Sequence, residues 1–130
     1  MAEALILLDT SVLIDFFRKT DKSKSHWMAL IAAGNSFAVS TITKFEIYAG
    51  AKSEQCEFWE RVFQHVAVLS VDESTVDVAV KVNNALKQKS KQIDIADLLI
   101  ASTAISNGLR IATLNRKHFE RIEGLQIVED

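Results

Sequence analysis

Short apolar runs and longer amphipathic segments alternate along the chain. Short continuous apolar runs are typical of strands buried on both faces, whereas apolar residues three and four positions apart predict helices. The runs predict strands at residues 4–8, 37–39, 66–69, 110–113 and 125–128. The periodic segments predict helices at 12–19, 27–31, 40–51, 55–64 and 94–107, and a long helix opened by Asp72. This alternation predicts an α/β fold with a mostly parallel sheet covered by helices on both faces.

Composition narrows the class of protein further. The chain has 130 residues, of which 48% are hydrophobic and 25% charged, and this size and balance predict one domain spanning residues 1–130. No apolar run approaches the roughly 20 residues of a membrane-spanning helix. The start has no basic segment of the kind a signal peptide carries, and Cys56 is the single cysteine, so we expect a cytoplasmic protein without a membrane anchor. A net charge of −2 argues against a wholly basic nucleic-acid binder.

Acidic residues stand where the predicted sheet would place a site. Asp9 directly follows the first apolar run, and sites in parallel sheets form beyond the carboxyl ends of the strands. Asp97 interrupts an otherwise apolar helix, where an unpaired carboxylate is costly. A structural role is open for both: Asp9 as a helix cap, and Asp97 as an acceptor for first-turn amides after a cap at Asp94.

Other polar residues have simpler interpretations. Glu46 stands three residues after Thr43, the spacing of a helix capping box, and Asp15 fits a solvated helix face. His26, His65 and His118 are too far apart for metal-ligand spacing, so we expect surface or internally satisfied histidines. Cys56 reads as a small hydrophobe, and the four glycines form no phosphate-binding loop. Basic residues gather in three clusters: Arg18, Lys19, Lys22 and Lys24; Lys87, Lys89 and Lys91; and Arg116, Lys117 and Arg121. Each is either a solvated face or a flank that holds a phosphate backbone beside an acidic centre.

Four segments taken in order resemble the PIN-domain ribonucleases, specifically the VapC-type toxins of toxin-antitoxin pairs. Residues 7–15 (LLDTSVLID) are similar to the opening strand of that family, and residues 40–46 (STITKFE) to its second motif. Residues 94–101 (DIADLLIA) are similar to the third motif, and residues 112–119 (ATLNRKHF) to the fourth. The resemblance covers essentially the whole chain and implies a PIN-like three-layer α/β/α sandwich.

The resemblance also implies a set of site residues. Carried over position by position, the catalytic acids are Asp9, Glu46 and Asp97, with Asp9 and Asp97 as the direct metal ligands and Asp94 as a neighbour. In the fourth motif the family often has a further acid, whereas this chain has Asn115, followed by Lys117 and His118. An amide oxygen at Asn115 can still bind a water on the metal. We expect Thr10, Ser11 and Thr113 to orient the ligands through their hydroxyls.

The implied chemistry is hydrolysis of RNA phosphodiester bonds. Clustered carboxylates repel one another and are stable as anions when a divalent cation neutralises them, and oxygen ligands favour Mg²⁺ or Mn²⁺. We expect Glu46 to orient or deprotonate the attacking water. The resemblance implies an endoribonuclease that acts on an exposed RNA loop, such as one in a tRNA or ribosomal RNA. It further implies a VapB-type antitoxin, a homodimer, a larger assembly with the antitoxin, and DNA contact only through the antitoxin.

Two other classes compete with this hypothesis. A receiver-type phosphoacceptor domain has similar length and alternation, but it requires adjacent acids after the first strand, where only Asp9 is present. A phosphatase of the haloacid dehalogenase type requires a second aspartate at the position of Ser11. A catalytically inactive PIN-like binding module also stays open because Asn115 replaces an acid, and metal binding without RNA cleavage would identify it.

Overall fold

A parallel β-sheet forms the centre of the molecule. The computed structural model describes residues 4–129 and contains strands β1 (Leu5–Leu8), β2 (Ser36–Ser40), β3 (Ala67–Leu69) and β4 (Arg110–Ala112). The strands pair in the order β3-β2-β1-β4, and every pair is parallel. Leu7 pairs with Ala38 on one side and with Ile111 on the other, so β1 is an interior strand.

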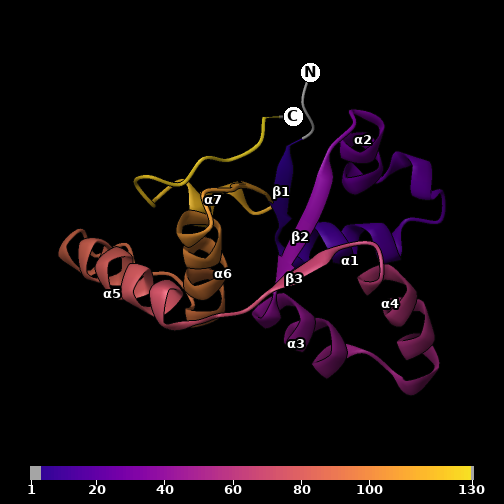
Figure 1. Cartoon of the computed structure of the whole chain (residues 1–130), viewed down its shortest axis with the longest axis horizontal. Coiled ribbons are helices and arrows are strands. Elements are labelled where there is room, and N and C mark those ends of the chain that lie inside the picture. The colour runs from indigo at the N-terminus through magenta and orange to yellow at the C-terminus, as the bar shows by residue number, and fades with distance from the viewer. Residues whose placement is uncertain (1–3, 130) are drawn as a thin grey trace.

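Helices cover both faces of this sheet. In chain order they are α1 (Thr10–Arg18), α2 (His26–Ala32), α3 (Thr41–Gly50), α4 (Cys56–Phe63), α5 (Glu73–Gln88), α6 (Ile95–Ser106) and α7 (Arg116–Phe119), with 3-10 turns η1 (Lys22–Lys24) and η2 (Ser53–Gln55). Figure 1 shows α1, α2 and α4 on one side of the sheet and α5, α6 and α7 on the other. The predicted three-layer α/β/α sandwich is confirmed. Within residues 4–129, no helix combines the length and apolarity that a membrane crossing needs.

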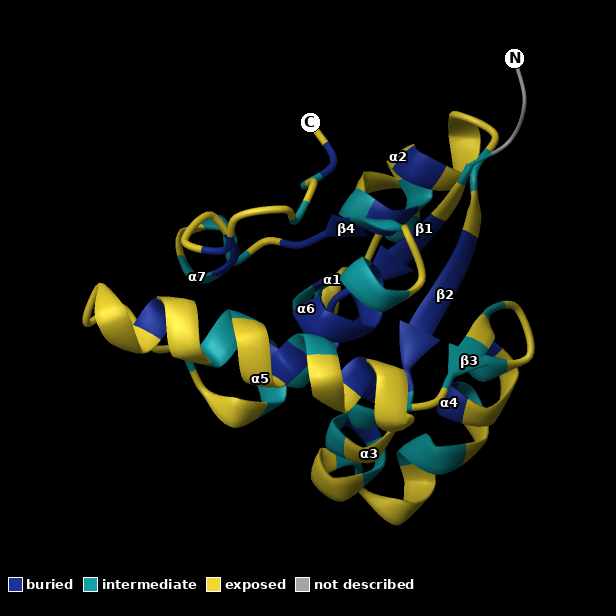
Figure 2. Ribbon diagram, turned by 60° about the vertical axis from the view of Figure 1, so that its left-hand side comes forward, coloured by how far each residue is buried: buried dark blue, intermediate teal, exposed yellow. Residues whose placement is uncertain are grey.

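The apolar run of β1 supplies both layers of the core. Successive side chains of a strand point to opposite faces. Accordingly, Ile6 and Leu8 pack with Trp59 in one cluster, whereas Leu7 packs with Ile100 and Ile111 in the other. Figure 2 shows these strands and α6 as mostly buried, while α5 exposes one side. A continuous apolar run is therefore needed at β1, because neither face of the sheet meets water there.

Helix boundaries follow local chemistry. The Ser40 hydroxyl accepts the Ile42 backbone N–H and caps α3. Gly34 and Gly108 end α2 and α6 with φ angles of 89° and 67°, a left-handed conformation that glycine adopts without a steric penalty. Both predicted helix stops are confirmed.

In the last part of the chain one predicted strand is wrong and one short helix was not predicted. The strand expected at residues 125–128 is wrong, because only an isolated bridge joins Ile127 to Ile111. Val128 and Gln126 each make one backbone hydrogen bond with Ile111, so the segment lies along β4 without forming a ladder. The short helix α7 was not expected, and it places residues 116–119 close to the first turn of α6. That contact matters for the site.

Candidate active site

Asp9 lies at the carboxyl end of β1, where its backbone N–H still donates to the Ala112 carbonyl at 3.0 Å. Its position is that of the residue before α1, yet its side chain makes no capping hydrogen bond. The alternative role as a side-chain cap is therefore wrong. The carboxylate is instead buried, with 3% of the residue exposed, and accepts hydrogen bonds from two hydroxyls.

Two hydrogen-bond relays end on Asp9. The Ser11 and Thr113 hydroxyls each lie 2.7 Å from Oδ2 of Asp9. Ser11 in turn accepts the Leu114 backbone N–H at 3.0 Å, and Thr113 accepts the Asn115 N–H at 2.8 Å. Because the amides only donate, both hydroxyl protons are directed toward the carboxylate. The turn after β4 thus fixes the orientation of Asp9.

The electrostatic environment of Asp9 opposes its negative charge. Burial raises the pKa of the Asp9 carboxyl above 3.8, the Ser11 and Thr113 hydroxyls lower it, and the charge of Asp97 raises it further. No lysine or arginine in residues 4–129 forms an ion pair with Asp9. The site therefore holds two carboxylates that repel each other, one of them buried without a cationic partner.

Glu46 on α3 joins this centre through Thr10. The Thr10 hydroxyl lies 2.7 Å from Oε1 of Glu46 and 2.9 Å from the hydroxyl of the buried Thr43. A hydroxyl carries one proton and a carboxylate only accepts, so Thr10 donates to Glu46 and Thr43 donates to Thr10. Thr43 is the third residue of α3, a helix capped by Ser40, so the capping-box role for Thr43 and Glu46 is wrong.

Asp97 lies in the first turn of α6 and contacts α7. Its Oδ2 is 3.0 Å from Nδ1 of His118, and that nitrogen is 2.8 Å from the Asn115 amide nitrogen. One ring nitrogen cannot donate to Asp97 and accept from Asn115 together. Because Asp97 only accepts, the group is satisfied when Nδ1 carries the proton and the Asn115 amide turns its oxygen toward the ring. Asp94 is the residue before α6, and its exposed side chain makes no capping bond.

The structure brings together most of the predicted residues. Ser11 and Thr113 bond the Asp9 carboxylate, the adjacent Thr10 bonds Glu46, and Asp97 and Asn115 meet through His118. His118 is the residue that the sequence argument missed, because the short helix that carries it has no periodic signal. Thr43 was assigned a capping role although it supports Glu46 through Thr10.

The donor set suits a hydrated divalent cation better than a site made entirely by the protein. Within residues 4–129, no three acidic, histidine or cysteine side chains are grouped closely enough to hold a metal ion by themselves. Mg²⁺ commonly uses one or two carboxylates and keeps several waters. Two repelling carboxylates, one buried without a cation, fit that pattern.

Open spaces border this site. A groove of about 540 Å³ is lined by Thr10, Ser11 and Leu114 together with the outer face of α1, and a second of about 230 Å³ contains Glu46. An apolar groove of about 590 Å³ lies elsewhere, among α1, α2 and α4, and none of the predicted acids lines it. The first groove therefore borders Thr10 and Ser11, whose hydroxyls bond Glu46 and Asp9, and the second borders Glu46 itself.

Comparison with known proteins adds independent findings. The family model of the PIN domain matches residues 6–125. Ribonuclease VapC1 of Methanocaldococcus jannaschii is 36% identical over 130 residues, which cover 98% of this chain and 89% of that protein. Among solved structures, VapBC2 from Rickettsia felis bound to a promoter DNA fragment has a TM-score of 0.81 at 26% identity, covering 95% of this chain and 97% of that one. VapBC-1 from nontypeable Haemophilus influenzae has a TM-score of 0.81 at 27% identity, covering 96% and 97%.

Proposed function

The chain belongs to the PIN-domain family, and from this premise we propose that it is a divalent-metal-dependent endoribonuclease toxin with Asp9, Glu46 and Asp97 as its catalytic acids. The proposed reaction is hydrolysis of RNA phosphodiester bonds in an exposed loop, such as one in a tRNA or ribosomal RNA, within one nuclease domain. Two relatives that align with this chain over 89% and 96% of their own length are named ribonucleases, which supports this activity.

The observation that carries the proposal is the state of Asp9. The Asp9 carboxylate is buried, is oriented by two hydroxyls and is repelled by Asp97. A nearby positive charge would stabilise its ionised form. An aspartate with a purely structural role would be expected to pair with a basic side chain or to cap α1, and Asp9 does neither. Its environment therefore supports cation binding.

We assign the cation, Mg²⁺ or Mn²⁺, to Asp9 and Asp97, with waters as the remaining ligands. When bound, the cation supplies positive charge next to the scissile phosphate and makes an attacking water more acidic. Ser11 and Thr113 hold Asp9 in place, and His118 holds Asp97. Such supporting contacts orient the ligands and are themselves needed for activity.

Glu46 has the role of orienting the attacking water and accepting its proton. The Thr10 hydroxyl donates to Oε1 of Glu46, which fixes the carboxylate and leaves lone pairs on its oxygens for a water. The hydroxide equivalent attacks phosphorus in line with the ester oxygen that leaves. One P–O bond forms and one breaks, so each cleavage consumes one water.

The partner assignment follows from the solved relatives, which are toxin-antitoxin complexes, some of them with DNA. We propose that a VapB-type antitoxin neutralises this chain, that the toxin forms a homodimer, and that DNA is reached only through the antitoxin in a larger assembly. We further propose a cytoplasmic location, because the proposed RNA substrate and antitoxin would both be encountered there.

The decisive experiment is cleavage of total cellular RNA by the purified chain with Mg²⁺, and with EDTA in its place. Asp97→Asn should abolish cleavage, whereas Asp94→Asn, a matched change three residues earlier on an exposed side chain without a capping bond, should leave it intact. Discrete fragments that require both Mg²⁺ and Asp97 support the proposal. Cleavage that persists in Asp97→Asn with saturating Mg²⁺ contradicts the site assignment. Metal binding without any cleavage would identify the inactive binding module instead.

A further inference from the structure

A groove beside the active site runs along α1 and ends among basic side chains. The first turn of α1 contributes Thr10 and Ser11 to this space of about 540 Å³, and the end of the helix contributes Arg18 and Lys19. Its volume falls in the range of roughly 300–1,000 Å³ that ligand clefts occupy. The exposed Leu114 adds an apolar wall. The groove thus combines an apolar wall with the basic side chains of Arg18 and Lys19, and it begins at Thr10 and Ser11 beside the active site.

Within residues 4–129, Arg18 is the basic residue of this groove that forms no ion pair with an acidic side chain. Lys19 forms an ion pair with Asp15 at 3.2 Å, whereas Arg18 is exposed and forms no ion pair within residues 4–129. Arg18 also lines the second groove, of about 230 Å³, which contains Glu46. Arg18 therefore lines both the groove at Thr10 and Ser11 and the groove that contains Glu46. A planar guanidinium with several donors is well suited to bind a phosphate.

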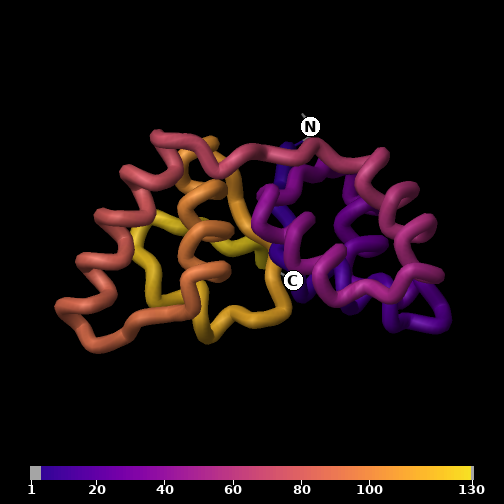
Figure 3. Tube along the Cα trace, turned by 90° about the horizontal axis from the view of Figure 1, so that it is seen from below, coloured from indigo at the N-terminus to yellow at the C-terminus, as the bar shows by residue number. Residues whose placement is uncertain are grey.

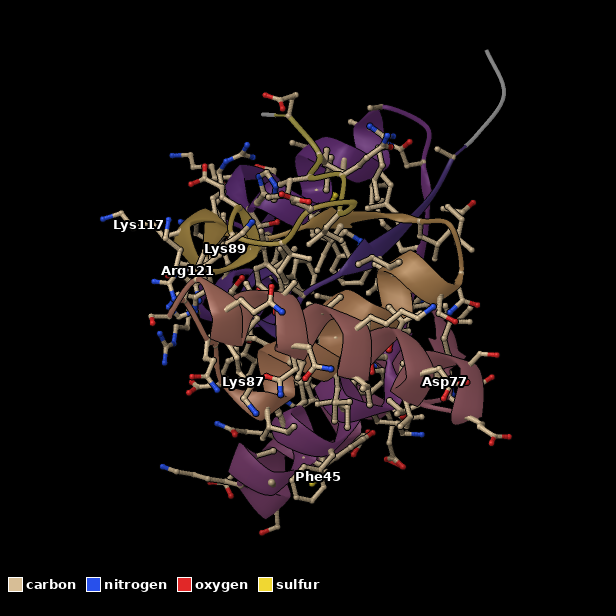
Figure 4. The ribbon with its side chains drawn as sticks, turned by 90° about the vertical axis from the view of Figure 1, so that its left-hand side faces the viewer. Phe45, Asp77, Lys87, Lys89, Lys117 and Arg121 are labelled. Atoms are coloured by element: carbon tan, nitrogen blue, oxygen red, sulfur yellow. The ribbon has the colours of Figure 1, made fainter. Side chains whose placement is uncertain are left out.

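Positive charge also gathers on the other side of the acids, in a group that we name the basic ridge: Lys87, Lys89, Lys91, Lys117 and Arg121. Lys89 pairs with Glu123 at 3.1 Å, and Arg121 donates to the Gln92 carbonyl at 3.2 Å, so the end of α5 and the turn after α7 are tied together. Figure 4 shows Lys89, Lys117 and Arg121 near one another, with Lys87 below them.

The two basic regions lie on either side of the acids. Lys117 directly precedes His118, which contacts Asp97, and Arg18 shares its groove with Thr10 and Ser11. Figure 3 shows the end of α5, then α7, then α1 following one another along one side of the molecule. Residues 87–92 and 116–123 hold six basic and two acidic residues, a net +4 in a chain whose net charge is −2. Charge is therefore separated on the surface rather than mixed.

We propose that a single RNA strand crosses the active site along this side, with one flanking phosphate on Arg18 and the other flank on the basic ridge. This assignment rests on the proposed function and names the substrate-binding surface that it requires. Ile14 and Leu114 offer an apolar wall against which a base can lie. An acidic peptide is a poorer fit, because it would bring further carboxylates to repelling acids, whereas a phosphodiester shares their cation.

RNA binding tests this path directly. The full-length chain with Asp97→Asn, which prevents cleavage, is titrated with a labelled single-stranded RNA of mixed sequence in Mg²⁺ at several salt concentrations. Arg18→Glu should weaken binding about 10-fold and reduce the slope of log K against log salt by about 0.7, the value for one lost phosphate contact on a single strand. Lys87→Glu with Lys117→Glu should reduce the slope by about 1.4, since two contacts are lost. The matched control, Lys44→Glu with Arg61→Glu, reverses two exposed charges on α3 and α4 and should change affinity less than about twofold.

Cleavage kinetics separate this inference from the proposed function. In the wild-type background, Arg18→Glu and the milder Arg18→Gln should raise KM and leave kcat at saturating RNA unchanged. If the wild type cleaves RNA but these variants bind and cleave as the control does, the path is wrong and the function stands. If the wild type does not cleave but RNA binding depends on Arg18 and the ridge, the function fails and the path stands. Normal RNA binding with lost inhibition by the antitoxin would make the surface a partner interface and overturn the proposal.

Discussion

Replacing Thr113 with valine removes one hydroxyl from the buried centre with little change in shape. The hydroxyl donates to Oδ2 of Asp9 at 2.7 Å and accepts the Asn115 N–H at 2.8 Å, and both Thr113 and Asp9 are buried. The valine would leave the carboxylate with one fewer donor and the amide without its acceptor. Hydrogen bonds to charged groups contribute about 1.5–3 kcal/mol, and an orphaned buried group costs about 1–3 kcal/mol. Because such losses overlap, we expect Thr113→Val to destabilise the fold by about 2–4 kcal/mol.

This loss is large enough to read from thermal unfolding. An unfolding entropy of about 2.1 cal/mol/K per residue gives about 0.27 kcal/mol/K for 130 residues, so Tm should fall by about 7–15 °C in EDTA. Cleavage should also fall about 10–100-fold, as expected when a contact that orients a metal ligand is lost. Thr113→Ser keeps the hydroxyl and should lose only about 1 kcal/mol for the missing methyl.

Thr103→Val is the matched control. Thr103 is equally buried, but its hydroxyl donates to the Leu99 carbonyl within α6, an acceptor that the helix already uses. We expect its unfolding free energy to change by less than about 1 kcal/mol. If Thr113→Val unfolds within about 2 °C of the wild type, or no lower than Thr103→Val, the hydroxyl does not satisfy a buried carboxylate and the argument for Asp9 fails.

Three further predictions address charge and positioning. Asp9→Asn should raise the Tm of the metal-free protein at neutral pH while abolishing cleavage, because burial raises the pKa of Asp9 and makes its ionised form costly; a lower Tm would contradict this. The stability that Asp9 contributes is present below pH 3.8 and lost as the pH rises through its folded pKa, so the gain should shrink in acid. The His26 backbone N–H holds the pKa of Asp15 below 3.8, so Asp15→Asn should lower Tm at pH 7, and the difference should disappear as the pH falls through the folded pKa. His118→Ala should lower kcat about 10–100-fold and leave RNA affinity unchanged, since His118 orients Asp97; a rise in KM alone would count against this role.

The fold was predictable where the pattern of apolar residues shows whether one or both faces of an element are buried. The apolar run at β1 indicates burial on both faces, and Gly34 and Gly108 mark helix ends because each adopts the positive φ angle that glycine favours there. Residues 125–128 are as apolar as a strand, and apolar residues predict that a segment is buried. A strand also needs a ladder of backbone hydrogen bonds to a neighbouring strand, which an apolar pattern does not predict. Ile127 bridges to Ile111 without such a ladder, and no local pattern reports this.

The candidate site was predictable in part for a similar reason. Asp9 was located by its place after the first apolar run, because sites in parallel sheets form beyond the carboxyl ends of the strands. Thr113 was expected from the family resemblance, and the pairing of β1 with β4 brings it to Asp9. His118 was not predictable, because its contact with Asp97 depends on the four-residue helix α7, which is too short for any periodic signal. For Thr43 the sequence suggested a contact that the structure does not contain. Its spacing from Glu46 matches a capping box, yet α3 begins at Thr41, two residues before Thr43.

The choice of hydroxyls around Asp9 has a functional consequence. A lysine or arginine in place of Ser11 or Thr113 would stabilise the buried carboxylate more strongly, but it would also neutralise it and compete with a bound cation. Hydroxyl dipoles orient the carboxylate and leave its net charge intact. The repulsion from Asp97 then persists until a divalent ion binds, so the same interaction that destabilises the metal-free fold favours metal binding. On this argument, Mg²⁺ should raise the Tm of the wild type more than that of Asp9→Asn, and an equal rise in both would show that the ion binds elsewhere.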